Sequence, residues 1–202
     1  MTDALDALSG IARGSTLDTL RRRKPITRDN AQASFDALFT PSDTAEMSVQ
    51  ERAAVALFVA SLHQDGPATD FYHRRLDDTG ATTSLIVGVL REAKQAATTG
   101  PFGAYPPGPL TAEDTDGPHW SVSDFGRDAI GARLSAALTH AYMLVFHTRD
   151  ASPAHLRALE AAGWSASGIV TLSQLVAFLA FQIRAAHGLR ALAAAQPVPT
   201  SE

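Results

Sequence analysis

Histidines and tyrosines are the side chains of this sequence whose types and positions suggest chemistry. The 202 residues include seven histidines and no cysteine, which excludes disulfides, thiolate metal sites and thiol-based redox mechanisms. His73 directly follows Tyr72 in a segment with helical spacing, and an imidazole can act as a general acid or base near neutral pH. One hypothesis is that His73, helped by Tyr72 or His140, handles a proton. A histidine that only forms a hydrogen bond between helices explains His73 equally well.

The histidine spacing does not favour a metal site. His140 and His147 share one face of a predicted helix, but seven residues separate them by a rise of about 10.5 Å, too far to chelate one ion. A mononuclear site would need His63 or His73 from another helix. The glycines of residues 100–108 alternate with prolines, which lack the N–H groups that a phosphate cradle requires. We therefore expect no metal and no cofactor.

Composition and charge limit the classes of partner. A formal charge of −4 and a pI near 5.9 argue against nucleic acid, because phosphate binding needs a positive surface. The basic run 21–24 is expected to be a solvated helix end. The N-terminal residues include Asp3 and Asp6 and lack the apolar core of a signal peptide, which predicts a cytoplasmic protein.

The hydrophobic pattern predicts an all-α protein, since every periodic segment has helical spacing and no segment alternates like a strand. We expect an N-terminal helical arm over residues 1–40 and one helical domain over 41–195. The domain has halves at about 48–100 and 127–195, joined by the Pro- and Gly-rich loop 100–126. The tail 196–202 is expected to be disordered. Ser48 and Glu51 fit a capping box, and the next helix is expected to begin near Thr69.

Residues 163–183 carry no charge, and the prediction of the core rests on this segment. A helix from about Ser167, capped by Ser165 or Ser167, has an apolar stripe formed by Ile169, Leu172, Val176, Leu179 and Ile183. Such a segment is long enough to span a membrane, but its polar residues and its lack of a basic flank at the start favour a core or interface helix. We therefore predict no membrane partner and a homo-oligomer, a dimer or larger.

An internal repeat is indicated when Gly80 is aligned with Gly163. Residues 73–90 then lie over residues 156–173, with matching apolar, basic and acidic positions. Each half reads as a helix, a short helix, a glycine turn and a long helix. Two such units are expected to pack about a pseudo-twofold axis.

The same residues resemble the carboxymuconolactone decarboxylase superfamily, which includes alkylhydroperoxidase D (AhpD-like) and peroxidase-related proteins. The segments ERAAVALFVASLHQDGPATDFYHRRLDDTGAT (51–82) and RDASPAHLRALEAAGWSASGIVTLSQLVAFLAFQIR (149–184) carry the resemblance, which covers roughly residues 30–192. It implies an AhpD-like helical bundle that forms oligomers, with a related peroxidase-like subunit as a further partner.

The resemblance also implies antioxidant-like thiol chemistry through a Cys-x-x-Cys-x-x-x-His motif, but the cysteines are absent. Aligning His73 with the family histidine places Gly66 and Thr69 at the cysteine positions. No other side chain replaces a thiolate that attacks an O–O bond. We therefore expect a protein without thiol peroxidase activity that acts as a binding or partner subunit.

The decarboxylase branch offers an alternative, because it lacks the cysteines and is similar in its Phe-x-His pattern followed by Gly-Ala-Thr, here 71–73 and 80–82. It implies a cofactor-free decarboxylase or isomerase of a small lactone or carboxylate, with His73 as general acid or base. Phe71, Trp120 and Tyr142 are the expected pocket walls. Trp120 lies in loop 100–126, and long irregular segments often carry function.

Overall fold

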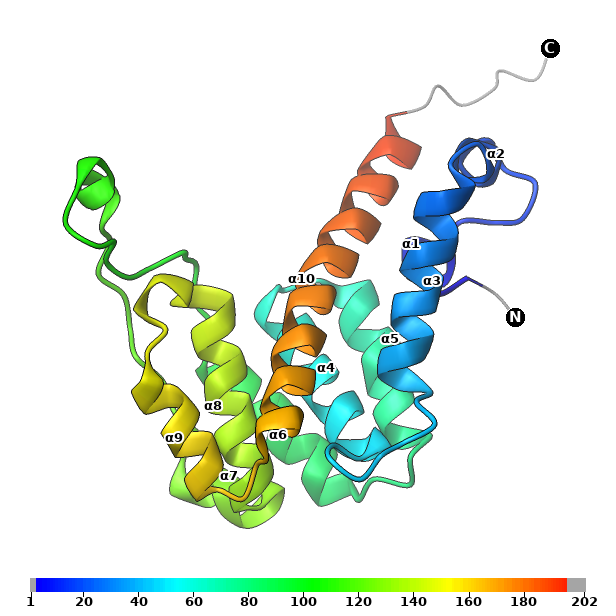
Figure 1. Cartoon of the computed structure of the whole chain (residues 1–202). Helices are drawn as coiled ribbons and strands as arrows, with labels where there is room; N and C mark the ends of the chain where they lie inside the picture. The colour runs from blue at the N-terminus through cyan, green and yellow to red at the C-terminus, as the bar shows by residue number, and fades with distance from the viewer. Residues whose placement is uncertain (1–2, 196–202) are drawn as a thin grey trace.

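Helices account for all the regular secondary structure of residues 3–195, the part of the chain that the computed structural model describes, apart from a single β-bridge between Gly103 and Thr115 (Figure 1). The all-α prediction is therefore confirmed. The α-helices are α1 (Ala4–Ser9), α2 (Thr16–Arg22), α3 (Pro25–Phe39), α4 (Val49–Leu62), α5 (Gly66–Asp77), α6 (Thr83–Gln95), α7 (Asp124–Ile130), α8 (Ala132–Phe146), α9 (Pro153–Ala161) and α10 (Ala166–Ala194), with 3-10 turns at Pro109–Glu113 and Thr148–Asp150. The predicted tail 196–202 lies outside the described residues.

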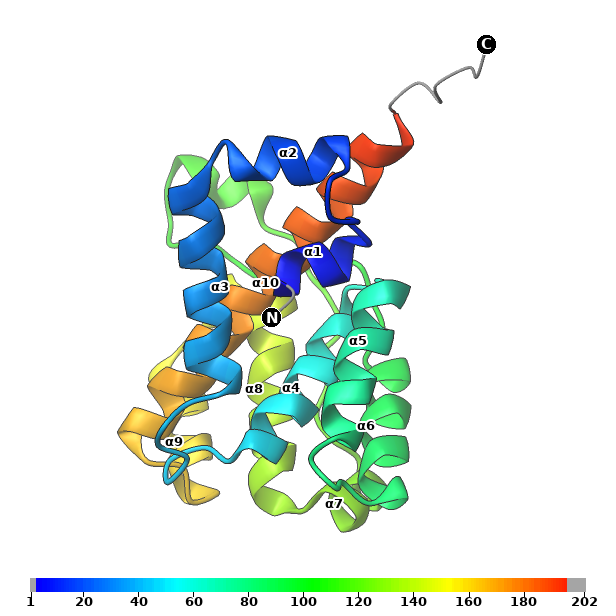
Figure 2. The same ribbon diagram turned by 90° about the vertical axis from the view of Figure 1, so that its right-hand side faces the viewer.

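Helix α4 lies at the centre of the bundle. Its residues 53–60 are all buried, because α5, α6, α8 and α10 pack around it (Figures 1 and 2). The predicted capping box begins the helix: the Ser48 hydroxyl accepts from the Glu51 N–H at 3.2 Å, and the Glu51 carboxylate accepts from the Ser48 N–H at 2.8 Å. The backbone groups at this helix start are thus satisfied within the sequence motif itself.

Helix α10 packs against α1, α3, α4, α8 and α9, and its predicted apolar stripe is buried. Ser165 is the N-cap, accepting from the Gly168 N–H at 3.0 Å. The opposite face stays open, and Val170 and Phe181 are 56% and 50% exposed. By length and composition α10 is the one single helix of residues 3–195 that could cross a membrane, although 44% of its most apolar window is buried. The absence of a membrane partner stays a prediction.

The N-terminal helices α1, α2 and α3 are held together by buried charge. Arg21 pairs with Asp3 at 2.8 Å and also with Asp6, and its side chain is only 9% exposed. Arg28 joins the cluster through Asp6 at 3.2 Å. The expectation that residues 21–24 form a solvated helix end is thus wrong for Arg21, because two carboxylates from α1 and its cap offset its desolvation.

The internal repeat and its pseudo-twofold axis stay predictions. Gly80 and Gly163 both have left-handed backbone, with φ of 75° and 86°, before the capped helices α6 and α10. Helix α5 begins earlier than expected, at Gly66. Asp65 supplies the N-cap by accepting from the Ala68 N–H at 3.0 Å, and Pro67 suits the first helical turn.

A buried hydrogen bond joins α5 to α10, and its loss should destabilise the fold. The Tyr72 hydroxyl donates to the Gln182 side-chain carbonyl, and both residues are buried. Tyr72→Phe should lower the free energy of unfolding by about 1–3 kcal/mol, because it leaves the Gln182 oxygen without a donor. The double variant Tyr72→Phe/Gln182→Met should recover much of this loss in urea denaturation. Equal stability of the single variant and the wild type would contradict this role.

Candidate functional site

The two residues predicted to act together on α5 point into different environments. His73 is exposed to solvent, whereas Tyr72 is fully buried against α10. Burial raises the pKa of Tyr72 well above its usual value, and its proton is committed to the Gln182 hydrogen bond. Tyr72 is therefore part of the core and shares no cavity with His73 among those found in residues 3–195.

His140 lies on α8 and is only 5% exposed. Figures 1 and 2 show α4 between α8 and α5, so the fold does not bring His140 to His73. Its Nε2 lies 3.3 Å from the Ser173 hydroxyl of α10, while its Nδ1 is buried without a partner among the described residues. Burial, with a smaller effect of His155, lowers the pKa of His140 to about 4. His140 is thus a neutral imidazole at physiological pH.

Two of the three predicted pocket walls meet. Trp120 packs against Tyr142 with ring centroids 5.4 Å apart, and both line a small cavity of about 130 Å³ near the end of α8. The Tyr142 hydroxyl donates to the Pro118 carbonyl at 2.6 Å. Phe71 lies elsewhere, 6.2 Å from the Phe35 ring of α3. The contacts of Tyr142 with Trp120 and with the Pro118 carbonyl anchor the loop to α8.

His147 completes this anchor of the loop. Its Nδ1 lies 2.8 Å from the Asp150 carboxylate and its Nε2 lies 3.0 Å from the Pro118 carbonyl. Both partners only accept, so the two bonds form together when each ring nitrogen carries a proton. The hydrogen bond from His147 is the main cause of a lowered Asp150 pKa. The Phe102 N–H adds a bond to the Phe146 carbonyl at 2.7 Å, fixing the start of the loop.

The positions aligned with the missing cysteines lie at the start of α5. Gly66 and Thr69 border a cavity of about 370 Å³, and the Thr69 hydroxyl donates to the Asp65 carbonyl at 3.0 Å. Within residues 3–195 no group of three or more histidine, cysteine or acidic side chains is placed to hold a metal ion. The chemistry of these positions is limited to hydrogen bonding.

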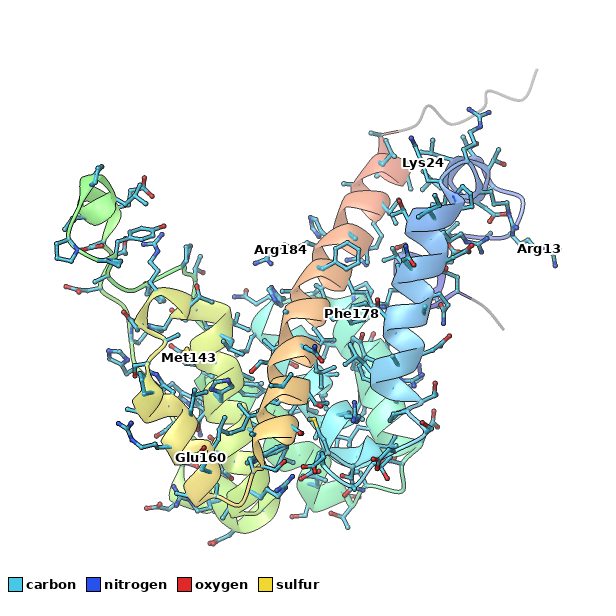
Figure 3. The ribbon with its side chains drawn as sticks, viewed as in Figure 1. Arg13, Lys24, Met143, Glu160, Phe178 and Arg184 are labelled. Atoms are coloured by element: carbon cyan, nitrogen blue, oxygen red, sulfur yellow. The ribbon has the colours of Figure 1, made fainter. Side chains whose placement is uncertain are left out.

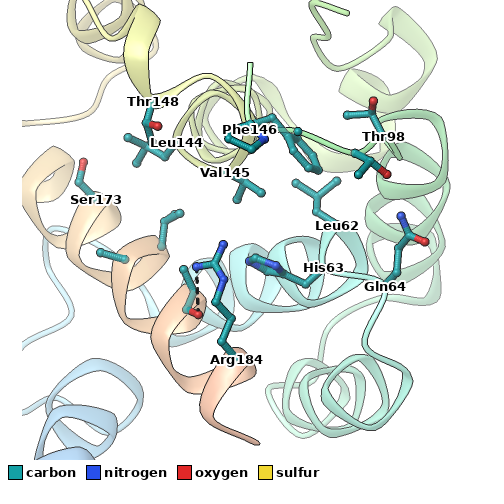
Figure 4. Close-up of a pocket in the computed structure, with 16 residues that line it drawn as sticks. Leu62, His63, Gln64, Thr98, Leu144, Val145, Phe146, Thr148, Ser173 and Arg184 are labelled. Atoms are coloured by element: carbon teal, nitrogen blue, oxygen red, sulfur yellow. Dashed lines mark hydrogen bonds between the residues drawn. The ribbon is translucent and has the colours of Figure 1, made fainter. Parts of the chain in front are cut away.

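A cavity of about 690 Å³, larger than those two, opens between α4, α8, α10 and residues 98–101 (Figure 4). Its volume is in the range of small-molecule sites. The walls are mainly apolar, and a few hydroxyl groups lie among them. The apolar lining residues are Leu62, Pro101, Leu144, Val145, Phe146, Val176, Ala177 and Ala180.

Two nitrogen-bearing side chains meet at one side of this cavity. Figure 4 shows the His63 ring beside the Arg184 guanidinium, and Figure 3 shows that Arg184 extends from the side of α10 away from Phe178. His63 Nε2 is buried without a hydrogen-bond partner among residues 3–195. Arg184 donates to the Ala180 carbonyl at 3.3 Å, and no carboxylate of residues 3–195 lies within ion-pair distance of it.

The position of His63 explains why its pKa is lowered. It follows α4 as the C-cap and precedes Gln64, whose φ of 53° is the one left-handed backbone angle outside glycine in the described chain. Burial lowers the pKa of His63, the Arg184 charge lowers it further, and Asp65 acts in the opposite direction. His63 is thus neutral near pH 7, beside the Arg184 guanidinium, which has no acidic partner in the described part of the chain.

Sequence reasoning named His63 only as a second metal ligand and did not assign Arg184 to a site. A signal was available for both. His63 precedes the break before Pro67, and Arg184 is the first charge after the uncharged segment 163–183. Residues at such breaks border the gaps that diverging helices leave.

Comparison with protein-family models, with curated proteins and with solved structures finds no match to this chain. The resemblance to the AhpD-like proteins therefore stays a prediction.

The depressed His140 pKa predicts a stability loss in mild acid. The unfolded chain binds the proton near pH 6.5 and the folded chain only near pH 4, so the stabilisation is complete above pH 6.5 and is lost as the pH falls toward 4. The shift corresponds to at most about 3–4 kcal/mol. His140→Gln, which cannot titrate, should flatten this part of the stability curve in urea denaturation across pH. The exposed His73→Gln is the matched control, and an unchanged curve in His140→Gln would refute the prediction.

Proposed function

We propose that this protein binds a small organic molecule, without thiol chemistry, in the cavity beside His63 and Arg184. One observation carries the proposal: an apolar cavity of about 690 Å³ is lined by His63, whose Nε2 is buried without a partner in the described chain, and by Arg184, which has no acidic partner there. Large apolar pockets with a few convergent polar groups are the usual form of ligand sites.

The free energy of the unpartnered groups supports a ligand. A buried nitrogen without a hydrogen bond costs about 1–3 kcal/mol, and a ligand oxygen at His63 would remove that cost. Gln64 adds a second cost, because a left-handed backbone is unfavourable for a residue with a side chain. Costs of this kind cluster at ligand sites, where binding offsets them.

The proposal is compatible with an AhpD-like, cysteine-free protein acting as a binding or partner subunit in the cytoplasm. The helix order and the left-handed Gly80 and Gly163 support that relationship. The exposed Val170 and Phe181 on α10 support a homo-oligomer, since an interface there would cover them. Light scattering at micromolar concentration tests it, and a monomeric mass would contradict it.

A decarboxylase or isomerase of a lactone or carboxylate remains the alternative, with His73 as the predicted acid or base. A general base has to reach its substrate, and the histidine that borders the large cavity is His63. Loss of lactone turnover in folded His73→Gln would support the alternative. Lactone turnover that depends on His63 would instead place the catalytic site in the cavity.

Filling the cavity should abolish binding without unfolding the protein. Ala177 is an exposed residue of α10 that borders the cavity, so a tryptophan there occupies the ligand volume while leaving the core intact. In calorimetric titrations with octanoate, octanol and γ-octalactone, Ala177→Trp should weaken binding about tenfold or more. Ala191→Trp is the control, because Ala191 is exposed on the same helix and does not border the cavity. Equal affinities in the two variants would refute the location of the site.

No thiol-dependent reduction of peroxides is expected from this protein. The chain has no cysteine to form the thiolate that attacks an O–O bond. Purified protein should therefore reduce organic hydroperoxides with dithiol donors no faster than a protein-free blank. Clear turnover by metal-free and cofactor-free protein would contradict this expectation.

A further inference from the structure

The geometry points to a specific ligand class, which rests on the proposed function: an amphiphilic monocarboxylate. We infer that its carboxylate binds Arg184, that His63 takes up a proton and donates to the same carboxylate, and that its apolar body lies against α4, α8 and α10. Carboxylates would thus be selected over neutral lactones and alcohols.

The charges around the cavity select an anion with one negative charge. Arg184 is the one charged residue among those that line it, and no acidic side chain borders it. A guanidinium offers two parallel N–H donors that match the two oxygens of a carboxylate. A dicarboxylate would leave its second charge against apolar walls, which is costly without a second cation.

His63 has the properties of a proton acceptor that responds to the ligand. In the ligand-free protein, burial and the neighbouring Arg184 charge keep the pKa of the imidazole low. A carboxylate on Arg184 would offset that positive charge and place a negative one beside the ring, and both effects favour the imidazolium. The proton on Nε2 would then have the acceptor that the free protein lacks.

The other groups near His63 do not prevent a ligand on Arg184 from changing the pKa of the imidazole. Asp65, on the link to α5, is already held by Arg190 and by the Ala68 N–H, and His187 lies 3.8 Å from its carboxylate. Residues 144–146 of α8 face the cavity with apolar side chains, and Thr148 and Thr98 supply only hydroxyl groups. Arg184 is therefore the charge that a ligand has to neutralise.

The apolar walls are suited to a hydrocarbon body. Leu144, Val145 and Phe146 line the cavity from α8 (Figure 4), and Val176 lines it from α10. Removing alkyl groups from water against such walls is favourable in proportion to the area buried. The Ser173 hydroxyl donates to the Ile169 carbonyl at 2.9 Å and so makes no demand on the ligand.

Calorimetric titration with four probes of equal length tests the inference: octanoate, octanamide, octanol and octylammonium. Octanoate should bind most tightly and octylammonium not measurably. Arg184→Gln should weaken the binding of octanoate about tenfold to a hundredfold, because it removes a hydrogen bond to a charged group. The affinity for octanol should stay unchanged. Arg184→Lys, which keeps the charge without the paired donors, should give an intermediate affinity. Arg184 is exposed, so these substitutions should leave the fold intact, which thermal melting checks.

The proton uptake has its own readout. Octanoate stays ionised between about pH 8 and pH 6. The free protein lowers the pKa of His63 and the bound carboxylate would raise it, so the affinity for octanoate should rise as the pH falls. Titrations in buffers of different ionisation enthalpy should show net proton uptake on binding in the wild type. His63→Gln should abolish the uptake, and His73→Gln, at an exposed site, should not. Uptake that persists in His63→Gln would overturn the role of His63.

The outcomes separate this inference from the proposed function. In one outcome all probes bind to the wild type, Ala177→Trp blocks their binding, and Arg184→Gln has no effect. The cavity is then a ligand site, but the ligand class is not a carboxylate. If octanoate binds equally well to Ala177→Trp, or if no probe binds, both the site and the ligand class are wrong. Preference for octanoate that is lost in Arg184→Gln supports both.

Discussion

The structure depends on the burial of α4 and of one face of α10. Residues 53–60 of α4 are buried on every side, and α10 carries no charge before Arg184. Such helices are stable in water only when other helices cover them, because exposing their apolar surface costs about 25 cal/mol per Å². The remaining helices pack around these two, and α1–α3 close the bundle through the buried Asp3, Asp6 and Arg21 cluster.

The candidate site follows from this packing. Helices α4, α8 and α10 contact one another along part of their lengths, and a cavity opens beyond the last turn of α4, where His63 ends that helix. The two side chains at this opening are polar, and Arg184 is exposed to solvent. The same position leaves His63 Nε2 buried and without an acceptor among residues 3–195. A site for a ligand with one charged end and one apolar end is the consequence.

Local signals in the sequence predicted much of the fold, because helix caps and apolar periodicity are read within a few residues. The Ser48 capping box, the Ser165 cap and the buried stripe from Ile169 to Ile183 are examples. The site was less predictable, since the motif drew attention to His73, whose orientation toward solvent depends on how α5 packs. Whether a histidine faces a cavity is set by contacts between distant residues, such as His63 with Arg184, which spacing along the chain does not encode.

A crystal structure of the protein with bound octanoate tests the central claim most directly. The account predicts that the carboxylate lies within about 2.7–2.9 Å of the Arg184 nitrogens, as in other charge-assisted hydrogen bonds, with the second oxygen at His63 Nε2. The chain of the ligand should lie between Val145 and Val176. Octanoate on the exposed face formed by Val170 and Phe181, or beside His73, with the cavity empty, would contradict the account.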